Sequence, residues 1–391
     1  MTAPLTFASY AAQLRALVRD TSANTLHEPN DAAFNELAVG LFSLQFDHVP
    51  VYRRFCEARQ AMPASVHHWN QIPALPVAAF KEFEISSLHP EERTTAFHSS
   101  GTTGQKPSRH FHSPDSLKLY ETSLLHSFRR HLLGESEDRN KGGQLGPVDK
   151  LGLVILAPSP TRVPHSSLAY MFEAVRRQFG SSDSVCVGAL DQAGAWTLDL
   201  EAVLFAIHGS ICAKRPIALL GTAFSFVHLL DHLAAKNLRY RLAEGSRVLE
   251  TGGYKGRSRS MPKNELHNLI TEYLGVPETH VVCEYGMSEL SSQAYDQTIT
   301  ECGVRSAECG VRQAQRVFFF PPWARVRLVS PETGLAVNEG EAGLIRVFDL
   351  ANVQSVLAIE TEDLGRRRGD GFELLGRTAL AEPRGCSLLA P

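Results

Sequence analysis

Short apolar runs alternate with helical stretches between about residues 92 and 300, and this alternation limits the folds open to the chain. The runs LGLVILAP (residues 151–158) and PIALLG (residues 216–221) have the length of buried strands. Helical stretches follow them at residues 168–179 and 224–235. Because parallel strands need a crossover connection, usually a helix, the pattern predicts an α/β region with a largely parallel sheet and flanking helices.

The two ends of the sequence differ from this central region. Residues 1–90 read as mostly helical, and the central α/β core would span residues 91–312. From 313 to 380, strand-like runs such as ARVRLVS, AGLIRVFDL and GFELLG are separated by the turn signals PETG, NEGE and RRRGDG, which predicts a small β-barrel or sheet. Residues 381–391 would form a short C-terminal tail.

Composition narrows the class of protein. The 391 residues are 43% hydrophobic and 21% charged with a net charge of −3, which favours a globular protein and argues against nucleic acid as a partner. The seven cysteines include no CxxC pair, which indicates reduced thiols in a cytoplasmic protein. No apolar stretch approaches the roughly 18 residues of a membrane span, and no signal peptide opens the chain. We therefore expect a cytoplasmic enzyme or binding protein.

The most informative segment is a run of hydroxyl side chains and glycines, SSGTTG. Glycines allow a tight turn that exposes successive N–H groups toward an anion, and the hydroxyls add donors. The segment suits a triphosphate or a pyrophosphate, and an ordinary Ser/Thr/Gly turn is the alternative. Its lysine is wrongly placed for a GxxxxGK[ST] loop. The six residues are Ser99, Ser100, Gly101, Thr102, Thr103 and Gly104.

A second segment, CEYGMSEL, follows the apolar run THVV. A strand that ends in a glycine turn displays its next side chains at the carboxyl edge of a sheet, where ligands bind in open α/β folds. Tyr285 offers a stacking face, Ser288 a hydroxyl, and Glu289 a carboxylate for Mg²⁺. Taken alone, the segment is equally compatible with a core tyrosine and a solvated glutamate at a helix start.

These two segments, in this order and about 185 residues apart, resemble the adenylate-forming ligases, which include acyl-CoA synthetases, luciferases and peptide-synthetase adenylation domains. SSGTTG is similar to the family's phosphate loop, and YGMSE to its YGxTE motif with serine in place of threonine. Asp363 stands in a segment similar to the TGD motif, with Glu362 in place of the glycine. Arg377 ends GFELLGR, which is similar to the family's GR pair.

A narrower resemblance, to the acyl-protein synthetase (LuxE-type) family, covers most of residues 72–390. The segments that carry it include IPALPVAAFK, HSSGTTG, ETGGYKGRSR, CEYGMSELSSQAYD and GLIRVFDLANVQSVLAIETEDLG. It implies the N-terminal domain of an adenylate-forming ligase, with the usual C-terminal lid domain missing or reduced because the chain ends about 14 residues after Arg377. It also implies a ligase that uses ATP and Mg²⁺ to activate a carboxylic acid, such as a fatty acid, as acyl-AMP and then forms a thioester.

The resemblance assigns a role to each candidate residue. The loop Ser99–Gly104 would hold the β- and γ-phosphates, Glu289 the Mg²⁺, and Ser288 the α-phosphate. Lys106, together with Lys255 and Arg257, would neutralise developing charge, although the two latter residues are equally compatible with solvated surface charges. Adenine and ribose would be contacted by Gly252, Gly253, Tyr285, Gly286, Asp363 and Arg377.

Two further residues concern the acyl group. His165 would line the acyl pocket or orient the carboxylate, and a structural histidine is the alternative. Cys386 in RGCSL matches the place of the cysteine that accepts the acyl group in the resembling family, and a cysteine without a role is the alternative. We expect the rival thiol, Cys283, to be buried and structural. The spacings of Cys302, Cys309 and the nearby His280 fit no usual zinc signature.

Three functions remain open from the sequence. The first is an acyl-protein synthetase whose acceptor is Cys386 or a partner protein, such as a reductase subunit or a carrier protein. The second is a carboxylate–CoA or carboxylate–amine ligase that passes the adenylate to a diffusible acceptor. The third is a silent homologue that binds nucleotide as a scaffold subunit. The intact phosphate loop and Glu289 argue against the third.

Overall fold

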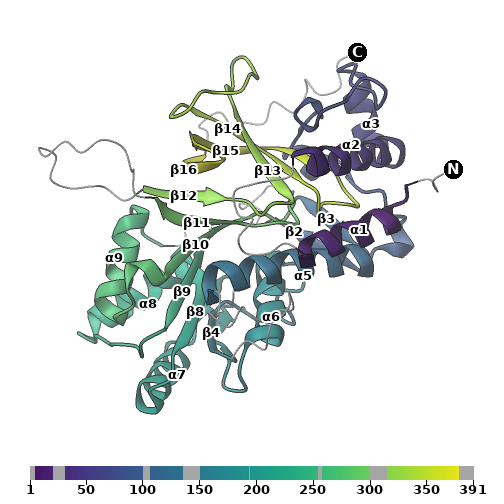
Figure 1. Cartoon of the computed structure of the whole chain (residues 1–391). Coiled ribbons are helices and arrows are strands. Elements are labelled where there is room, and N and C mark those ends of the chain that lie inside the picture. The colour runs from purple at the N-terminus through teal and green to yellow at the C-terminus, as the bar shows by residue number, and fades with distance from the viewer. Residues whose placement is uncertain are drawn as a thin grey trace, which may run out of the picture. The chain divides into compact units, whose positions relative to one another are not determined.

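The computed structural model describes residues 5–20, 31–99, 106–134, 150–192, 194–253, 258–299 and 315–377 (Figure 1). Contacts divide the chain into two compact units. Unit 1 comprises Met1–Leu124 and Met287–Pro391, and unit 2 comprises Leu125–Gly286. Unit 1 therefore joins the two ends of the sequence, and the four-part division inferred from composition stays a prediction.

The N-terminal part of unit 1 is mostly helical. In its first helix, Tyr10, Leu14 and Val18 recur every fourth residue and are fully buried, so they form the inner face. Pro50 is the first residue of the third helix. Its missing N–H group costs no hydrogen bond there, because the N–H groups of a first turn have no partner within the helix. The helices of this part are α1 (Phe7–Asp20), α2 (Asp31–His48), α3 (Pro50–Glu57) and α4 (Ala79–Glu82), with the 3₁₀ turns η2 (Trp69–Gln71) and η3 (Pro90–Glu92) and the start of α5 (Pro114–Phe128).

The C-terminal part of unit 1 is an antiparallel sheet. Its strands run in the order β13 (Ala324–Val329), β14 (Ala342–Asp349), β15 (Ala358–Arg368), β16 (Gly371–Arg377), β12 (Gln315–Phe319) and β11 (Ala294–Ile299), and the short β1 (Leu75–Pro76) pairs with β15 in parallel. The strand-like runs predicted after residue 315 are therefore strands of one sheet, which confirms this part of the predicted fold class.

Unit 2 is built on a parallel sheet, as the alternation of apolar runs and helices predicts. Its strands run in the order β10 (Val281–Tyr285), β9 (Arg247–Thr251), β8 (Ile217–Thr222), β4 (Gly152–Leu156) and β5 (Val185–Cys186). The other elements are α6 (Ser167–Phe179), β6 (Gly188–Leu190), β7 (Trp196–Leu198), α7 (Leu200–Ala213), α8 (Ala223–Ala235), α9 (Lys263–Leu274), the π-helical turn η4 (Arg129–Leu133) and the 3₁₀ turn η5 (Glu278–His280).

Apolar strand residues hold the sheet of unit 2 against its helices. Leu219, Val248 and Val281 lie in one buried cluster with Leu229 of α8 and Ile270 of α9. Figure 1 shows α8 and α9 on one side of these strands and α6 on the other. Because both faces of a parallel sheet are covered in this way, its strands are apolar throughout, and polar residues are expected only at the strand ends.

Candidate active site

A hairpin in unit 1 brackets the Ser/Thr/Gly segment. β2 (Thr95–His98) pairs antiparallel with β3 (Arg109–His112), so the segment connects two neighbouring strands. The Ser99 N–H donates to the Ser108 carbonyl at 3.2 Å, and the Ser108 N–H donates to Ser99 Oγ at 3.0 Å. These two bonds close the base of the predicted phosphate loop. Residues 100–105 lie outside the described part of the chain, so the placement of Ser100, Gly101, Thr102, Thr103 and Gly104 stays a prediction.

The second motif meets this hairpin within unit 1. The Ser108 hydroxyl donates to a carboxylate oxygen of Glu289. His110 Nδ1 lies 2.9 Å from the carbonyl of Ser288 and donates to it, since a carbonyl only accepts. The Ser288 hydroxyl donates to the His98 carbonyl at 3.1 Å. Ser288 and Glu289 are therefore fixed to the hairpin strands that flank the predicted phosphate loop, although the two motifs are far apart in the sequence.

Glu289 is a buried acid with a 4% exposed side chain, so the alternative of a solvated glutamate at a helix start is wrong. Burial raises the pKa of Glu289, while the Ser108 hydrogen bond and the charges of Arg377 and Lys81 lower it. A buried carboxylate whose direct partner is a neutral hydroxyl would be stabilised by a divalent cation. The donor set therefore fits Mg²⁺, which usually binds one or two protein carboxylates together with substrate phosphates.

Asp363 and Arg377, predicted to contact the nucleotide, face each other on neighbouring strands. They are direct partners in the pairing of β15 with β16, and Arg377 Nε lies 3.4 Å from Asp363 Oδ1. The arginine side chain is 73% exposed and the aspartate only 15%, so the pair lies at the surface of unit 1. Since the charge of Arg377 also reaches Glu289, unit 1 gathers three of the predicted site residues.

Unit 2 holds the predicted adenine-side residues at one edge of its parallel sheet. Gly252 and Gly253 follow β9, while Tyr285 ends β10 and Gly286 follows it. Because β9 and β10 are parallel neighbours, both glycine turns leave the carboxyl edge, where ligands bind in such sheets. Gly252 has a φ of +67°, which favours glycine, and Tyr285 is only 7% exposed.

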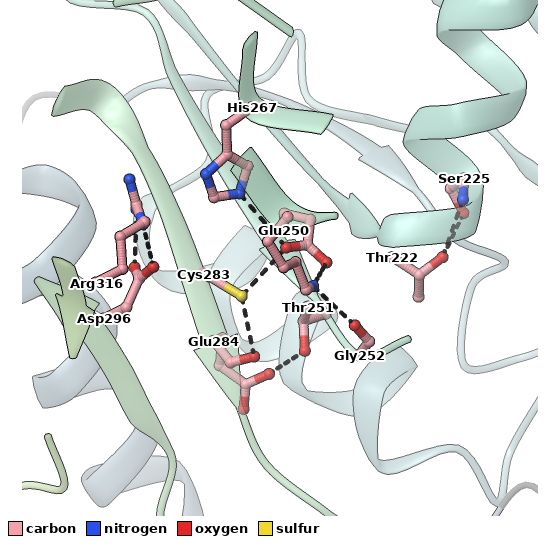
Figure 2. Close-up of polar contacts among 11 residues, drawn as sticks. Thr222, Ser225, Glu250, Thr251, Gly252, His267, Cys283, Glu284, Asp296 and Arg316 are labelled. Atoms are coloured by element: carbon pink, nitrogen blue, oxygen red, sulfur yellow. Dashed lines mark hydrogen bonds and ion pairs between the residues drawn. The ribbon is translucent and has the colours of Figure 1, made fainter. Parts of the chain in front are cut away.

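Sequence reasoning missed an ion pair at this edge, whose buried acid, Glu250, is labelled in Figure 2. Glu250 is fully buried near the end of β9, and Lys263 Nζ lies 2.5 Å from its carboxylate. The Cys283 thiol donates to the same carboxylate at 3.1 Å, and His267 Nε2 lies 3.7 Å away. Burial opposes ionisation, but Lys263 and His267 outweigh it and hold the pKa of Glu250 at about 2. Lys263 also donates to the Gly252 carbonyl at 3.1 Å, so it ties the ion pair to the glycine turn.

A second acid on the adjacent strand behaves in the opposite way. Glu284 is the register partner of Thr251, whose hydroxyl donates to its carboxylate (Figure 2). Burial, with a further contribution from the charge of Glu250, raises the pKa of Glu284 to about 7. The only sequence signal for both acids is a glutamate next to the last residue of an apolar run, in RVLET and in VVCEY.

The remaining predicted residues are dispersed. Lys106 is exposed at the start of the segment leading into β3 in unit 1, and His165 is exposed before α6 in unit 2. Cys283 is buried, as expected. Three predicted residues lie outside the described part of the chain, namely Lys255, Arg257 and Cys386.

The described residues contain neither a ready-made metal cluster nor a membrane-spanning helix. No group of three or more His, Cys, Asp or Glu side chains in the described ranges is placed to hold a metal ion by itself. Within the same ranges, no helix is both long and apolar enough to cross a bilayer.

Known proteins resemble this chain over most of its length. The family model described as acyl-protein synthetase, LuxE, matches residues 11–390. The long-chain-fatty-acid–luciferin-component ligase of Vibrio harveyi is 21% identical over 363 residues, which cover 90% of this chain and 86% of that protein. The protein of the same name from Aliivibrio fischeri is 22% identical over 362 residues, covering 89% of this chain and 85% of that protein.

A solved structure confirms the fold. An open conformation of 2-hydroxyisobutyryl-CoA ligase matches with a TM-score of 0.62 and 12% identity, covering 93% of this chain and 79% of that one. This similarity shows the α/β fold of the adenylate-forming ligases, as the sequence predicts. Since the family model spans nearly the whole sequence, the chain belongs to the acyl-protein synthetase, LuxE, family.

Proposed function

We propose that this protein is an ATP-dependent acyl-protein synthetase. It activates a carboxylic acid as acyl-AMP with release of pyrophosphate, and then transfers the acyl group to a thiol. The observation that carries the proposal is the junction in unit 1, where Ser108 and His110 of the hairpin bind Glu289 and Ser288. An adenylating enzyme needs its phosphate loop and its metal-binding carboxylate held together, because positioning and charge neutralisation supply most of the catalysis.

In the adenylation step, a carboxylate oxygen of the acid attacks the α-phosphorus of ATP, and the bond to pyrophosphate breaks. We assign the segment Ser99–Gly104 to the β- and γ-phosphates and Ser288 to the α-phosphate. Glu289 would hold Mg²⁺, which neutralises charge on the phosphates when it is bound. Lys106, which is exposed beside the loop, would add a cation for the charge that develops on the leaving pyrophosphate.

We assign nucleoside contacts in each unit by itself. In unit 2, Gly252 and Gly253 let the backbone approach adenine, and Tyr285 with Gly286 provides a stacking face. In unit 1, Asp363 accepts hydrogen bonds from the ribose hydroxyls, and Arg377 contacts ribose or phosphate. The ion pair of these two side chains supports the assignment, because it holds the carboxylate and the guanidinium together.

In the transfer step, a thiolate attacks the acyl carbon, the bond to the phosphate oxygen breaks, and AMP leaves. We assign the acceptor thiol to Cys386, from which a partner such as a reductase subunit or a carrier protein would take the acyl group. His165 would orient the acid. The two bacterial relatives are named for long-chain fatty acids, so these acids are the first substrates to test.

The function is tested by pyrophosphate exchange with ATP, Mg²⁺ and a panel of fatty, aryl and amino acids. Acid-dependent exchange supports adenylation, and no exchange with any acid refutes it. A labelled acid then distinguishes the acceptors on a denaturing gel. Label on the protein that neutral hydroxylamine removes supports a thioester. Loss of this label in Cys386→Ser, while exchange persists, supports Cys386 as its site. Exchange without labelled protein, followed by product formation with CoA or an amine, refutes the acyl-protein step and supports a diffusible acceptor.

A further inference from the structure

A buried carboxylate that the proposed chemistry does not use lies at the end of β14. Asp349 is fully buried, and its Oδ2 accepts the N–H groups of Ser291 at 2.9 Å and Ser292 at 2.7 Å. Its Oδ1 accepts the Ser292 hydroxyl at 2.7 Å and the Ala351 N–H at 3.0 Å. Asp349 therefore holds the two residues that come second and third after Glu289.

All four donors to Asp349 are uncharged. Burial raises the pKa of Asp349, while the four hydrogen bonds lower it. An apolar residue of similar volume would avoid the desolvation penalty of a buried acid, so a carboxylate at this place needs a reason beyond packing. The reason lies in the direction of its bonds, which turn the backbone donors of the Ser291–Ser292 segment toward β14.

Asn352, three residues further along, binds the same segment through a backbone carbonyl and a side-chain hydroxyl. Its Nδ2 donates to the Glu289 carbonyl at 3.0 Å and to the Val356 carbonyl at 2.8 Å, and its Oδ1 accepts the Ser291 hydroxyl at 3.2 Å. Asn352 is itself braced, because Gln45 of α2 donates to its carbonyl at 2.8 Å. The Glu289 carbonyl is thus bound by Asn352, and the N–H groups of Ser291 and Ser292 are bound by Asp349.

The hairpin fixes the residue before Glu289 in the same way, through the bonds of Ser288 to His110 and His98. Burial lowers the pKa of His110 to about 4, so its ring is neutral at physiological pH and donates one hydrogen to the Ser288 carbonyl. The side chain of Glu289 is then directed to Ser108, at the base of the predicted phosphate loop.

We infer that Asp349 is a positioning residue for the metal-binding carboxylate of Glu289, and that Asn352 assists it. The inference rests on the proposed role of Glu289. The backbone is held in place on both sides of Glu289. Its carboxylate therefore has less conformational entropy to lose when Mg²⁺ and ATP bind. Residues that orient a metal ligand commonly change metal affinity by about ten- to a hundredfold when they are altered.

The test compares Asp349→Asn with a matched control, Asp296→Asn. The asparagine has the same shape as Asp349, but an NH₂ group replaces one of the two carboxylate oxygens. That group cannot accept a hydrogen bond from the N–H or O–H donors that face it. Asp296 is also buried in unit 1, but its partner is Arg316, at 2.5 Å on the neighbouring strand (Figure 2). The control therefore perturbs a buried carboxylate in the same sheet, in an ion pair between β11 and β12.

The direct readout is binding of Mn²⁺, followed by electron paramagnetic resonance with α,β-methylene-ATP present. We expect Asp349→Asn to bind Mn²⁺ about tenfold more weakly than the wild type, and Asp296→Asn to bind it normally. The magnesium concentration for half-maximal pyrophosphate exchange should rise by a similar factor. Ser292→Ala, which removes one donor to Asp349 and spares the backbone, should shift both readouts about two- to threefold in the same direction.

Equal Mn²⁺ affinity in Asp349→Asn and wild type overturns the inference, and so does an equal loss in Asp296→Asn, which would indicate a general effect on folding. If Asp349→Asn does not fold, the shift in Ser292→Ala decides in the same way. Failure of the proposed function looks different, because the wild type would then show no exchange with any acid. Mn²⁺ binding that depends on Asp349 would support the positioning role even in that case, whereas a wild type that binds no Mn²⁺ overturns both.

Discussion

The pKa of Glu284, raised from 4.5 to about 7, leads to a quantitative prediction for Glu284→Gln. The glutamine keeps the shape of the side chain and can still accept the Thr251 hydroxyl. Each step of one in pKa corresponds to about 1.4 kcal/mol, so the fold favours the protonated acid by about 3 kcal/mol. Because the side chain is only 5% exposed, little of this difference is screened by solvent.

The sign follows from which state keeps the proton. Below about pH 4.5 the carboxyl is protonated in both the folded and the unfolded chain, and its stabilising contribution is fully present. Between about pH 4.5 and 7 the unfolded chain releases the proton while the folded chain retains it, so the free energy of unfolding falls as the pH rises. The glutamine variant lacks this loss and should gain about 3 kcal/mol relative to the wild type between pH 4.5 and 8.

Chemical denaturation of both proteins at a series of pH values measures this difference, since every other titrating group is common to them. Infrared spectra give a direct readout, because the band of a protonated carboxyl should disappear in Glu284→Gln and in wild type above pH 8. Glu250→Gln is the matched control on the adjacent strand. The pKa of Glu250 is lowered to about 2, so its contribution changes only below about pH 4.5. Parallel stability curves for Glu284→Gln and wild type from pH 5 to 8 would refute the reasoning.

Three further changes test the site. Glu289→Gln should abolish most pyrophosphate exchange, because the metal loses its anionic ligand, and wild-type exchange in this variant would remove Glu289 from the site. Asp363→Ala should raise the KM for ATP with every acid tested, whereas a defect confined to one class of acid would contradict a role in nucleotide binding. Lys263→Met leaves Glu250 buried without its cation, so it should cost about 2–3 kcal/mol in thermal or chemical unfolding, less than for a fully buried pair because Lys263 is 37% exposed. It should also raise the KM for ATP, because Lys263 holds the Gly252 carbonyl, and an unchanged KM would separate that turn from the nucleotide.

The sequence predicts those parts of the fold that follow from local pattern. Runs such as LGLVILAP become strands with both faces covered, because a parallel sheet buries its strands completely. The predicted helices at 168–179 and 224–235 match α6 and α8 within one residue, since Ser166 and Thr222 cap their first turns. The order of SSGTTG and YGMSEL indicates the family because such hydroxyl-rich and glycine-rich segments are specific in composition.

The supporting residues of the site could not be predicted from local pattern. Asp349 ends the run GLIRVFD and reads as an ordinary strand terminus, yet it binds residues almost sixty positions earlier in the sequence. Ser108 lies outside the SSGTTG motif, and its bond to Glu289 joins positions separated by 181 residues. Such pairings depend on how β14 and the β2–β3 hairpin pack in unit 1, and periodicity carries no information on that packing.

Glu250 and Glu284 show why residue type alone does not assign chemistry. Both are glutamates next to the last residue of neighbouring parallel strands, and both are almost completely buried. Lys263 and His267 reach Glu250 from α9, so that acid is ionised, whereas Glu284 receives one hydroxyl bond and the repulsion of its neighbour, so its pKa lies near 7. Successive residues of a strand alternate between the two faces of the sheet. Glu250 with its register partner Cys283, and Glu284 with its partner Thr251, therefore lie on opposite faces and have different partners. The helix α9 therefore decides which of the two carboxylates is fully ionised at neutral pH, and with it which one can hold the Gly252 turn through a lysine.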